Sequence, residues 1–305
     1  MSADEIDDST APLIEHLAEL RTRLIWSVLA FVVGMIICFS FGSMILDFLL
    51  VPIEKTMRSL GNPNPVMQYT APQEYFFVLI RISMVGGLAL SFPVIAYQLW
   101  RFVAPGLYKS EKNAFLPFLV ASPLLFLLGA AFAHFVVVPL AMAFFLGFAD
   151  LPSLFSAFVQ GDGTAGAITP NANSEGIHIV FNGKVNETLD ITLKMIVAFG
   201  LCFQLPVLLT LMGKAGLTTA RALRSVRKWA IVGILTVAAI VTPPDVTTQV
   251  MLFTVVYGLY ELSILLVQQV ERKREKELRA QGLWVDDDEF DDEEDEAGDS
   301  GNGKA

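Results

Sequence analysis

Long stretches without a charged side chain alternate with short polar segments along the 305 residues. A helix that crosses the roughly 30 Å hydrocarbon core of a bilayer needs about 20 mostly apolar residues. The runs Leu24–Leu46, Phe76–Leu99 (with Arg81 near its start) and Met195–Met212 reach or approach that length. The run Trp229–Val267 is also apolar, but Thr242–Asp245 interrupts it with two consecutive prolines, which cannot continue a helix. We therefore expect a hairpin of two spans there, the first of them short.

The run Ala114–Ala149 is harder to interpret, because its 36 uncharged residues are too long for one straight span and barely enough for two. Lysine and arginine decide between the alternatives, since these residues concentrate in cytoplasmic loops. One span places nearly all of them on one side, whereas two spans would put Arg221–Lys228 outside. We expect one span, bent near Pro117, Pro123 or Pro139 and continuing along the interface after Pro139. The predicted fold is all-α and polytopic, with six transmembrane helices, both termini cytoplasmic, and the last two helices short.

Composition supports an integral membrane protein, since 54% of the residues are hydrophobic. The net charge of −10 arises from 286–296, where ten of eleven residues are acidic. So dense a block of like charge repels itself, and it predicts a disordered, solubilising tail, with binding of a basic partner as the alternative. The expected organisation is an amphipathic cytoplasmic N-terminal helix (1–23), a membrane domain (24–267) with an external loop (139–188), and a cytoplasmic tail (268–305), basic and then acidic and disordered.

No catalytic or metal-binding pattern is visible in the sequence. The histidines His16, His134 and His178 fall in different compartments of the expected topology, so a shared metal ion is not expected. Cys38 and Cys202 lie in apolar runs, where packing is the simplest role for a thiol. The sequence has no Gly-x-Ser-x-Gly elbow, no phosphate-binding glycine loop with lysine and no His-Glu-x-x-His motif. We expect no metal, no cofactor and no enzymatic activity.

Two polar residues at membrane depth are candidates for a contact. Gln204 lies within one apolar run and Glu261 within the last one. An unpaired amide or carboxyl group in hydrocarbon is unfavourable, so each needs a partner. For both residues that partner is either another helix of the same bundle or a translocating segment or partner helix.

The polar segment Tyr97–Lys112, between two apolar runs, has the composition of a binding loop. It contains several aromatic residues, a Pro-Gly turn and one acid, Glu111, among basic residues. Near the N-terminus, Pro12–Leu24 has leucines at three- and four-residue spacing and carries a second acid, Glu19. The simplest role of this stretch is an interfacial helix that leads into the first span. Alternatively, the two acids together suit a basic peptide, because the planar arginine fork binds carboxylates in a bidentate manner.

Several short motifs occur in a fixed order between about residues 12 and 270. They are His-Leu-x-Glu-Leu-Arg at 16–21, Pro-Val-Ile-x-Tyr-Gln-x-Trp at 93–100, Phe-x-Ala-Pro-Gly-Leu-Tyr-x-x-Glu at 102–111, Phe-Gly-x-x-Phe-x-x-Pro at 199–206 and Thr-Pro-Pro-Asp at 242–245. Through these motifs the chain resembles the TatC family, the polytopic receptor subunit of the twin-arginine protein translocase. The resemblance implies a multi-pass protein of the cell inner membrane. It also implies a role in exporting folded proteins with the energy of the proton gradient, without ATP hydrolysis by this subunit.

The resemblance further implies a binding site for signal peptides that carry two consecutive arginines. Glu19 and Glu111 would lie near the arginine pair, and Arg21 and Phe102 would line the same cytoplasmic site. The expected partners are these peptides on folded cargo, the single-span subunits TatA and TatB, and the lipid bilayer. We also expect a homo-oligomer within the complex, and no nucleic acid.

Four residues are candidates for transport or partner contact. By resemblance, Pro52 matches the proline of the first external loop and Asp245 matches the acid of the last one; Gln204 and Glu261 complete the group. The family usually has glutamate where this chain has Gln204, so we interpret that residue as a polar contact rather than an obligatory proton relay. The loop 150–186 is also longer than is usual for the family.

The alternative function is a secondary transporter for a small solute. Such transporters show paired interrupted helices and internal repeats. No convincing repeat relates residues 24–138 to residues 195–267. A membrane-embedded enzyme would need a nucleophile–base pair or a ligand cluster, which we do not find. The sequence therefore favours the receptor and scaffold of a protein translocase.

Overall fold

The structure is a computed structural model that describes residues 3–59, 64–103, 116–148, 183–242 and 246–280. Most of these residues are helical. The elements are α1 (Ala3–Ser40), α2 (Gly42–Ser59), β1 (Met67–Gln68), α3 (Glu74–Val103), α4 (Leu116–Phe132), the π-helical turn η3 (Ala133–Val137), α5 (Val138–Phe148), β2 (Gly183–Lys184), α7 (Val185–Cys202), α8 (Leu205–Lys214), α9 (Ala220–Ser225), α10 (Arg227–Val241) and α11 (Val246–Ala280).

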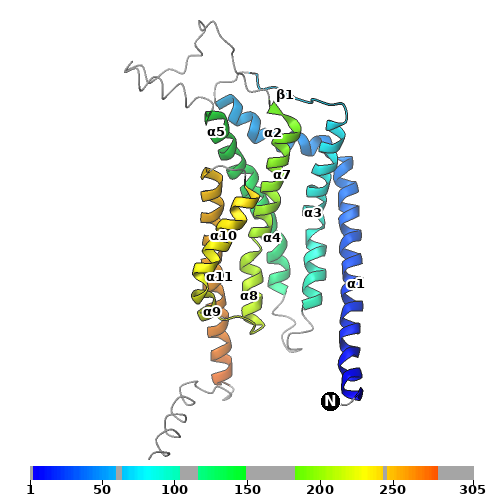
Figure 1. The fold of residues 1–305 in the computed structure, drawn as a ribbon, viewed down its shortest axis with the longest axis vertical. Coiled ribbons are helices and arrows are strands. Elements are labelled where there is room, and N and C mark those ends of the chain that lie inside the picture. The colour runs from blue at the N-terminus through cyan, green and yellow to red at the C-terminus, as the bar shows by residue number, and fades with distance from the viewer. Residues whose placement is uncertain (1–2, 60–63, 104–115, 149–182, 243–245, 281–305) are drawn as a thin grey trace, which may run out of the picture.

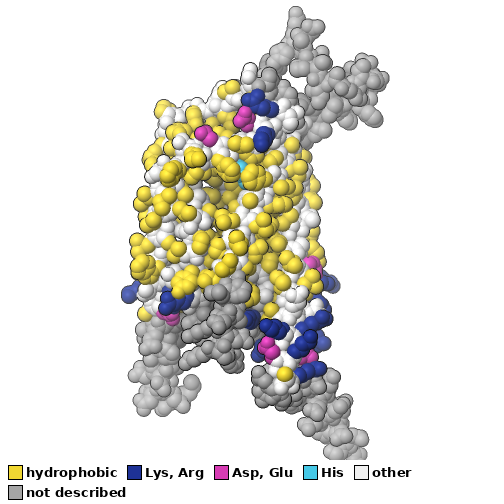
Figure 2. Space-filling view, turned by 180° about the vertical axis from the view of Figure 1, so that it is seen from behind, with side chains coloured by type: hydrophobic (Ala, Val, Ile, Leu, Met, Phe, Trp, Pro, Cys, Tyr) yellow, Lys and Arg dark blue, Asp and Glu magenta, His cyan; other side chains and the backbone are white. Residues whose placement is uncertain are grey.

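Most helices run side by side along the long axis of the molecule (Figure 1). The N-terminus of α1 and the C-terminal end of α11 lie at one end, which we call the terminal end. The other end, where α2 and β1 lie, we call the strand end. Figure 2 shows a broad hydrophobic surface between the ends, with most Lys and Arg beyond it at the terminal end. A belt of exposed apolar side chains around parallel helices is what a multi-pass membrane protein presents to lipid.

Five helical stretches in the described part of the chain are long and apolar enough to cross a bilayer. They are Leu17–Ser40, Glu74–Phe102, Phe118–Gly147, Val185–Lys214 and Val246–Glu277. With 15 residues, α10 is about 22 Å long, which is shorter than the hydrocarbon core. The sixth span therefore stays a prediction, as does the cytoplasmic placement of both termini.

The first apolar run does not form the single span predicted for Leu24–Leu46. Helix α1 ends at Ser40, and α2 then runs across the strand end of the bundle (Figure 1). The buried residues of α2 include four at three- and four-residue spacing, Leu46, Leu49, Ile53 and Met57. These residues belong to the main hydrophobic core, and a straight continuation of α1 would leave them in water. Burial of this face explains why the chain turns after Ser40.

Helices α1 and α3 approach each other closely through glycine. A Cβ atom placed on Gly34 would lie 2.8 Å from the carbonyl oxygen of Gly87. A Cβ atom placed on Gly87 would lie 2.7 Å from the backbone nitrogen of Met35. Because no larger residue fits between the two backbones at this distance, these glycines set the separation of α1 and α3.

The run 116–148 forms α4, η3 and α5 without a gap, which agrees with the single bent stretch expected from the sequence. Its irregularity is the π-helical turn η3, where the backbone N–H of Val138 donates to the carbonyl of Ala133. The next residue, Pro139, has no N–H to donate, and its ring disfavours a regular preceding turn. A widened turn at this place accommodates the proline without a sharp kink.

Helix α7 begins at Val185, ten residues before the span predicted from Met195. It lies at the centre of the bundle, with Leu189, Met195 and Phe199 almost fully buried. A turn at Phe203–Gln204 separates it from α8, which has Pro206 in its first turn. Proline is favoured at that position because its missing N–H is not needed there.

The last hairpin breaks where predicted, since α10 ends at Val241 and α11 begins at Val246. Helix α10 is short, but α11 has 35 residues, so the prediction that both last helices are short is wrong for α11. Its polar end carries ion pairs one turn apart, Lys273–Glu277 and Glu275–Arg279, which support a helix in water. Residues 268–280 are therefore helical rather than disordered, and the acidic segment lies outside the described residues.

Candidate functional site

A groove of about 580 Å³ opens near the terminal end between α1 and α3. Its walls are Ala18, Glu19, Thr22, Arg23 and Trp26 from α1, and Gln98 and Arg101 from α3. The groove brings Glu19, the acid predicted near the N-terminus, next to residues that lie about 80 positions later in the chain.

The charged side chains in this groove have hydrogen-bond partners within the protein. Arg23 donates from Nε to Oε1 of Glu19 over 3.1 Å, and its Nη2 bonds to the same oxygen. Arg101 donates from Nη1 to the hydroxyl of Tyr97 over 3.4 Å. Among the described lining residues, one carboxylate thus lies with two guanidinium groups.

The other three residues predicted for this site are not among the described residues that line the groove. Arg21 is exposed and does not line the groove, although it lies on the same helix. Phe102 is partly buried in the last turn of α3. Glu111 lies outside the described residues. The structure therefore places Glu19 in a groove and leaves the approach of Glu111 as a prediction.

The segment predicted as a loop from Tyr97 is helical as far as Val103. The helix ends shortly before Pro105, whose ring disfavours helical geometry at the preceding residue. Trp100 consequently packs on a helix face against Phe92, Ala96 and Phe126. Its indole Nε1 is buried without a hydrogen-bond partner among the described residues.

Gln204 makes a reciprocal pair of hydrogen bonds with Ser122 of α4. Its Nε2 donates to the Ser122 carbonyl over 2.8 Å, and the Ser122 hydroxyl donates to its Oε1 over 2.7 Å. The pair joins α4 to the turn between α7 and α8, 82 residues later in the chain. Of the two alternatives for Gln204, this geometry favours the interhelical hydrogen bond.

Glu261 also finds its partners within the bundle. Arg227 donates from Nη2 to Oε2 over 2.6 Å, and the Tyr257 hydroxyl donates to Oε1 over 2.9 Å. The ion pair therefore links α10 to α11. Tyr260, which precedes Glu261 in α11, donates to the carbonyl of Leu223 in α9 over 2.7 Å. Helix α11 thus holds the short α9–α10 segment in place through several polar contacts.

Of the two remaining predicted contact residues, the structure describes one, Pro52, near the strand end. Pro52 is buried inside α2, and its carbonyl accepts a hydrogen bond from the Thr56 hydroxyl over 2.9 Å. Asp245 lies outside the described residues.

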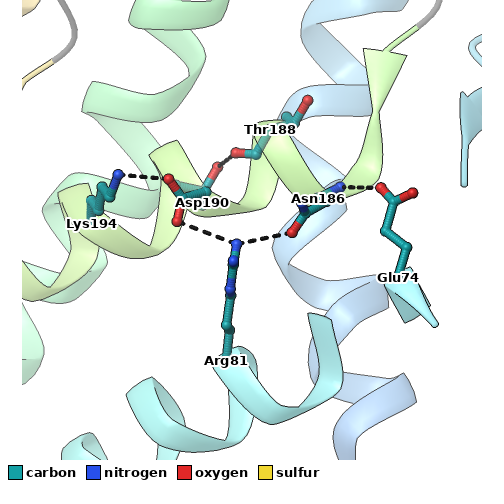
Figure 3. A network of polar contacts seen from close by, with 7 residues as sticks. Glu74, Arg81, Asn186, Thr188, Asp190 and Lys194 are labelled. Atoms are coloured by element: carbon teal, nitrogen blue, oxygen red, sulfur yellow. Dashed lines mark hydrogen bonds and ion pairs between the residues drawn. The ribbon is translucent and has the colours of Figure 1, made fainter. Parts of the chain in front are cut away.

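The sequence analysis missed a polar network between α3 and α7 near the strand end (Figure 3). Arg81 donates from Nη1 to Oδ1 of Asn186 over 2.9 Å and lies 3.5 Å from Asp190. Lys194 lies 2.6 Å from the same Asp190 carboxylate. The available signal in the sequence was a basic residue, Arg81, and an acidic one, Asp190, each near the start of an apolar run. Only the fold shows that these two runs are neighbours.

Glu74 was also missed by the sequence analysis, and it joins the segment before α3 to the start of α7. Its Oε2 accepts hydrogen bonds from the backbone N–H groups of Thr70 and Ala71 over 2.6 and 3.3 Å. Its Oε1 accepts the N–H of Asn186 over 3.3 Å (Figure 3). One buried carboxylate therefore connects the start of α3 to the start of α7, beside the parallel pair of β1 and β2.

Other reactive side chains are isolated in the described part of the chain. No group of three or more His, Cys, Asp or Glu is placed there to hold a metal ion. His134 is buried in η3, stacks on Phe48 with 4.6 Å between ring centroids, and has no hydrogen-bond partner among the described residues. Cys38 is a free, buried thiol, and Cys202 is free and partly buried.

Comparison with known proteins is consistent over nearly the whole chain. The family model for the Sec-independent protein translocase protein (TatC) matches residues 15–254. Sec-independent protein translocase protein TatC of Magnetococcus marinus is 40% identical over 293 residues, covering 94% of this chain and 95% of that protein. The proteins of the same name from Aquifex aeolicus and Escherichia coli are 39% and 33% identical, covering 87% and 84% of this chain and 98% and 88% of those proteins.

The fold agrees with a solved relative. A crystal structure of the twin arginine translocase receptor TatC superposes with a TM-score of 0.66 at 38% identity, covering 84% of this chain and 99% of that one. The matching sequence and the matching arrangement of helices lead to the same conclusion: this chain belongs to the TatC family of Sec-independent protein translocase proteins.

Proposed function

We propose that this protein is the receptor and core subunit of a twin-arginine translocase, and not an enzyme. In this role it binds the twin-arginine signal peptides of folded cargo and scaffolds TatA and TatB for export driven by the proton gradient. The observation that carries the proposal is the groove between α1 and α3, where the Glu19 carboxylate already binds a guanidinium group. Family membership supports the same function.

The charge distribution supports a cytoplasmic position for the groove. On the face that Figure 2 shows, most Lys and Arg residues gather at the terminal end. Because basic residues concentrate in cytoplasmic segments, this end faces the cytoplasm in our proposal, with the protein spanning the inner membrane several times. A signal peptide that emerges in the cytoplasm then reaches the groove directly.

The chemistry of the groove suits an arginine-containing peptide. A guanidinium group offers several N–H donors in a plane, and charge-assisted hydrogen bonds to carboxylate are stronger than neutral ones. In our proposal Glu19 binds one arginine of the pair and Glu111 lies near the other. Phe102 and Arg21 border the same site.

The remaining predicted residues are assigned to partner subunits or to the fold. We retain Pro52, near the strand end, and Asp245 as candidate contacts for TatA or TatB. For Gln204 and Glu261 the hydrogen bonds within the bundle support an indirect role, in which they hold α4, α8, α10 and α11 in the arrangement that partners recognise.

Substitution of the two acids tests the binding site. Glu19→Ala and Glu111→Ala should each reduce crosslinking of a radiolabelled twin-arginine peptide by about tenfold or more, because each removes a charged hydrogen-bond acceptor. The protein should still insert in the membrane. Glu54→Ala is a matched control, since Glu54 pairs with Arg58 one turn away but lies on α2 at the strand end. Undiminished crosslinking to the Glu19→Ala, Glu111→Ala double variant would contradict the site.

A further inference from the structure

The contact between Arg23 and Glu19 differs from other ion pairs of the same spacing. The pairs Glu54–Arg58 and Glu275–Arg279 also join residues one helical turn apart, and their arginine side chains are 53% and 56% exposed. The side chain of Arg23 is only 14% exposed. Such pairs at a helix surface are normally solvated and weak, whereas Arg23 lies in the wall of the groove with its charge directed at the groove's carboxylate.

The contact resembles the one expected for a ligand. Two guanidinium nitrogens of Arg23 bond to one oxygen of Glu19. An arginine of a bound peptide would use the same donors on the same acceptor. Two donors already occupy that oxygen, so a ligand arginine that binds Oε1 or grips both oxygens in a bidentate manner must displace Arg23.

We propose that Arg23 is a built-in occupant of the peptide site, which holds Glu19 in the empty receptor and is displaced when a signal-peptide arginine binds. This inference rests on the proposed function of Glu19. Every arginine-containing peptide must displace Arg23 from the same peptide-free receptor. The displacement therefore lowers the affinity for all such peptides by the same factor. The receptor then binds its signal peptides reversibly, and Glu19 is not left without a partner after release.

The opposite role for Arg23 makes the opposite prediction. If Arg23 served to orient Glu19 for the ligand, its removal would weaken peptide binding. If it acted only through its positive charge in the groove, removal of Arg101 would have the same effect, because Arg101 lines the same groove but contacts Tyr97. The three possibilities are therefore separable by binding measurements.

The test uses the full chain in lipid nanodiscs and a fluorescent peptide with two consecutive arginines, with affinity measured by anisotropy. Arg23→Gln should bind about two- to fivefold more tightly than the wild type, the range expected for loss of a competing ion pair. Glu19→Gln should bind more weakly. In the Glu19→Gln background, Arg23→Gln should give no further gain, because no carboxylate remains to be released. Arg101→Gln should give a smaller gain than Arg23→Gln.

Each outcome separates this inference from the proposed function. Unchanged affinity of Glu19→Gln would contradict the proposed function itself. Weaker binding by Glu19→Gln, with no gain or a loss in Arg23→Gln, would overturn only the role of Arg23. An equal gain in Arg101→Gln would assign the effect to groove charge and would also overturn it. Should Arg23→Gln fail to fold, Arg23→Lys keeps the charge without the planar fork, and its affinity must lie above that of the wild type.

Discussion

At the scale of single residues, the amide of Gln204 and the carboxylate of Glu261 are bonded to other helices of the same chain. Polar groups at membrane depth need such partners, because lipid offers none. The interhelical bonds of Gln204 require both a donor and an acceptor on one side chain, which an amide supplies and an ionised carboxylate does not. The hydrogen bonds to Ser122 therefore favour glutamine over an ionised glutamate at this position.

Substitution of Gln204 tests this explanation. Gln204→Leu loses both bonds to Ser122 and should be destabilised by about 1 kcal/mol, the usual size for such bonds in membranes. Gln204→Glu retains the acceptor for the Ser122 hydroxyl and should be impaired less. The measurements are thermal unfolding in detergent and export of a folded reporter protein from cells whose own TatC protein has been deleted. Ser122→Ala is the control, since it removes one bond of the two. Equal export by wild type, Gln204→Leu and Gln204→Glu would reduce Gln204 to a packing residue.

At the scale of elements, the position of α1 depends on its contact with α3. Gly34 and Gly87 allow the two backbones to meet, whereas much of the rest of α1 is exposed, including Leu24, Val33 and Ile36. Since the groove has one wall on each helix, we expect its width to depend on the separation that the glycine contact allows. An error in the packing of these two helices therefore reaches the candidate binding site.

Gly87→Ala tests the dependence of the groove on helix packing. The added methyl group would meet the backbone of Met35 at 2.7–2.8 Å, so the helices must separate, at a cost of about 1–3 kcal/mol. Thermal unfolding and peptide crosslinking should both be reduced. Gly258→Ala is the matched control, because a Cβ at Gly258 meets nothing within 4 Å and alanine favours the helix. If Gly87→Ala were as stable as Gly258→Ala, the close contact would not be needed.

At the scale of the whole molecule, orientation follows from charge and the number of spans from length. The described Lys and Arg residues favour the terminal end as cytoplasmic. If α10 crosses the membrane, the start of α11 faces the outside of the cell; if it does not, the start of α11 stays on the cytoplasmic side. With 15 residues, α10 can cross only where the bilayer is thin or where neighbours shield its ends.

Labelling of single cysteines tests the orientation and the sixth span together. In a background with Cys38→Ala and Cys202→Ala, a membrane-impermeant maleimide applied from outside should label Arg58→Cys at the strand end. It should not label Arg224→Cys, which lies in α9. Val246, at the start of α11, is 72% exposed, so Val246→Cys should be labelled from outside if α10 crosses. Labelling of Val246→Cys only after lysis would contradict the six-span topology. Labelling of Arg224→Cys in intact cells would show that the terminal end faces outward, opposite to our proposal.

The sequence by itself determined the membrane character, the approximate spans, the break at 242–245 and the family. These properties depend on local quantities, namely the length of apolar runs, the rigidity of proline and the identity of residues in short motifs. Tertiary structure alone decided the turn after Ser40, the pairing of Gln204 with Ser122 and the network around Arg81 and Glu74. The physical reason is that a polar side chain in a bilayer takes whatever partner packing brings near, and partners about 80 to 110 residues away leave no local signal.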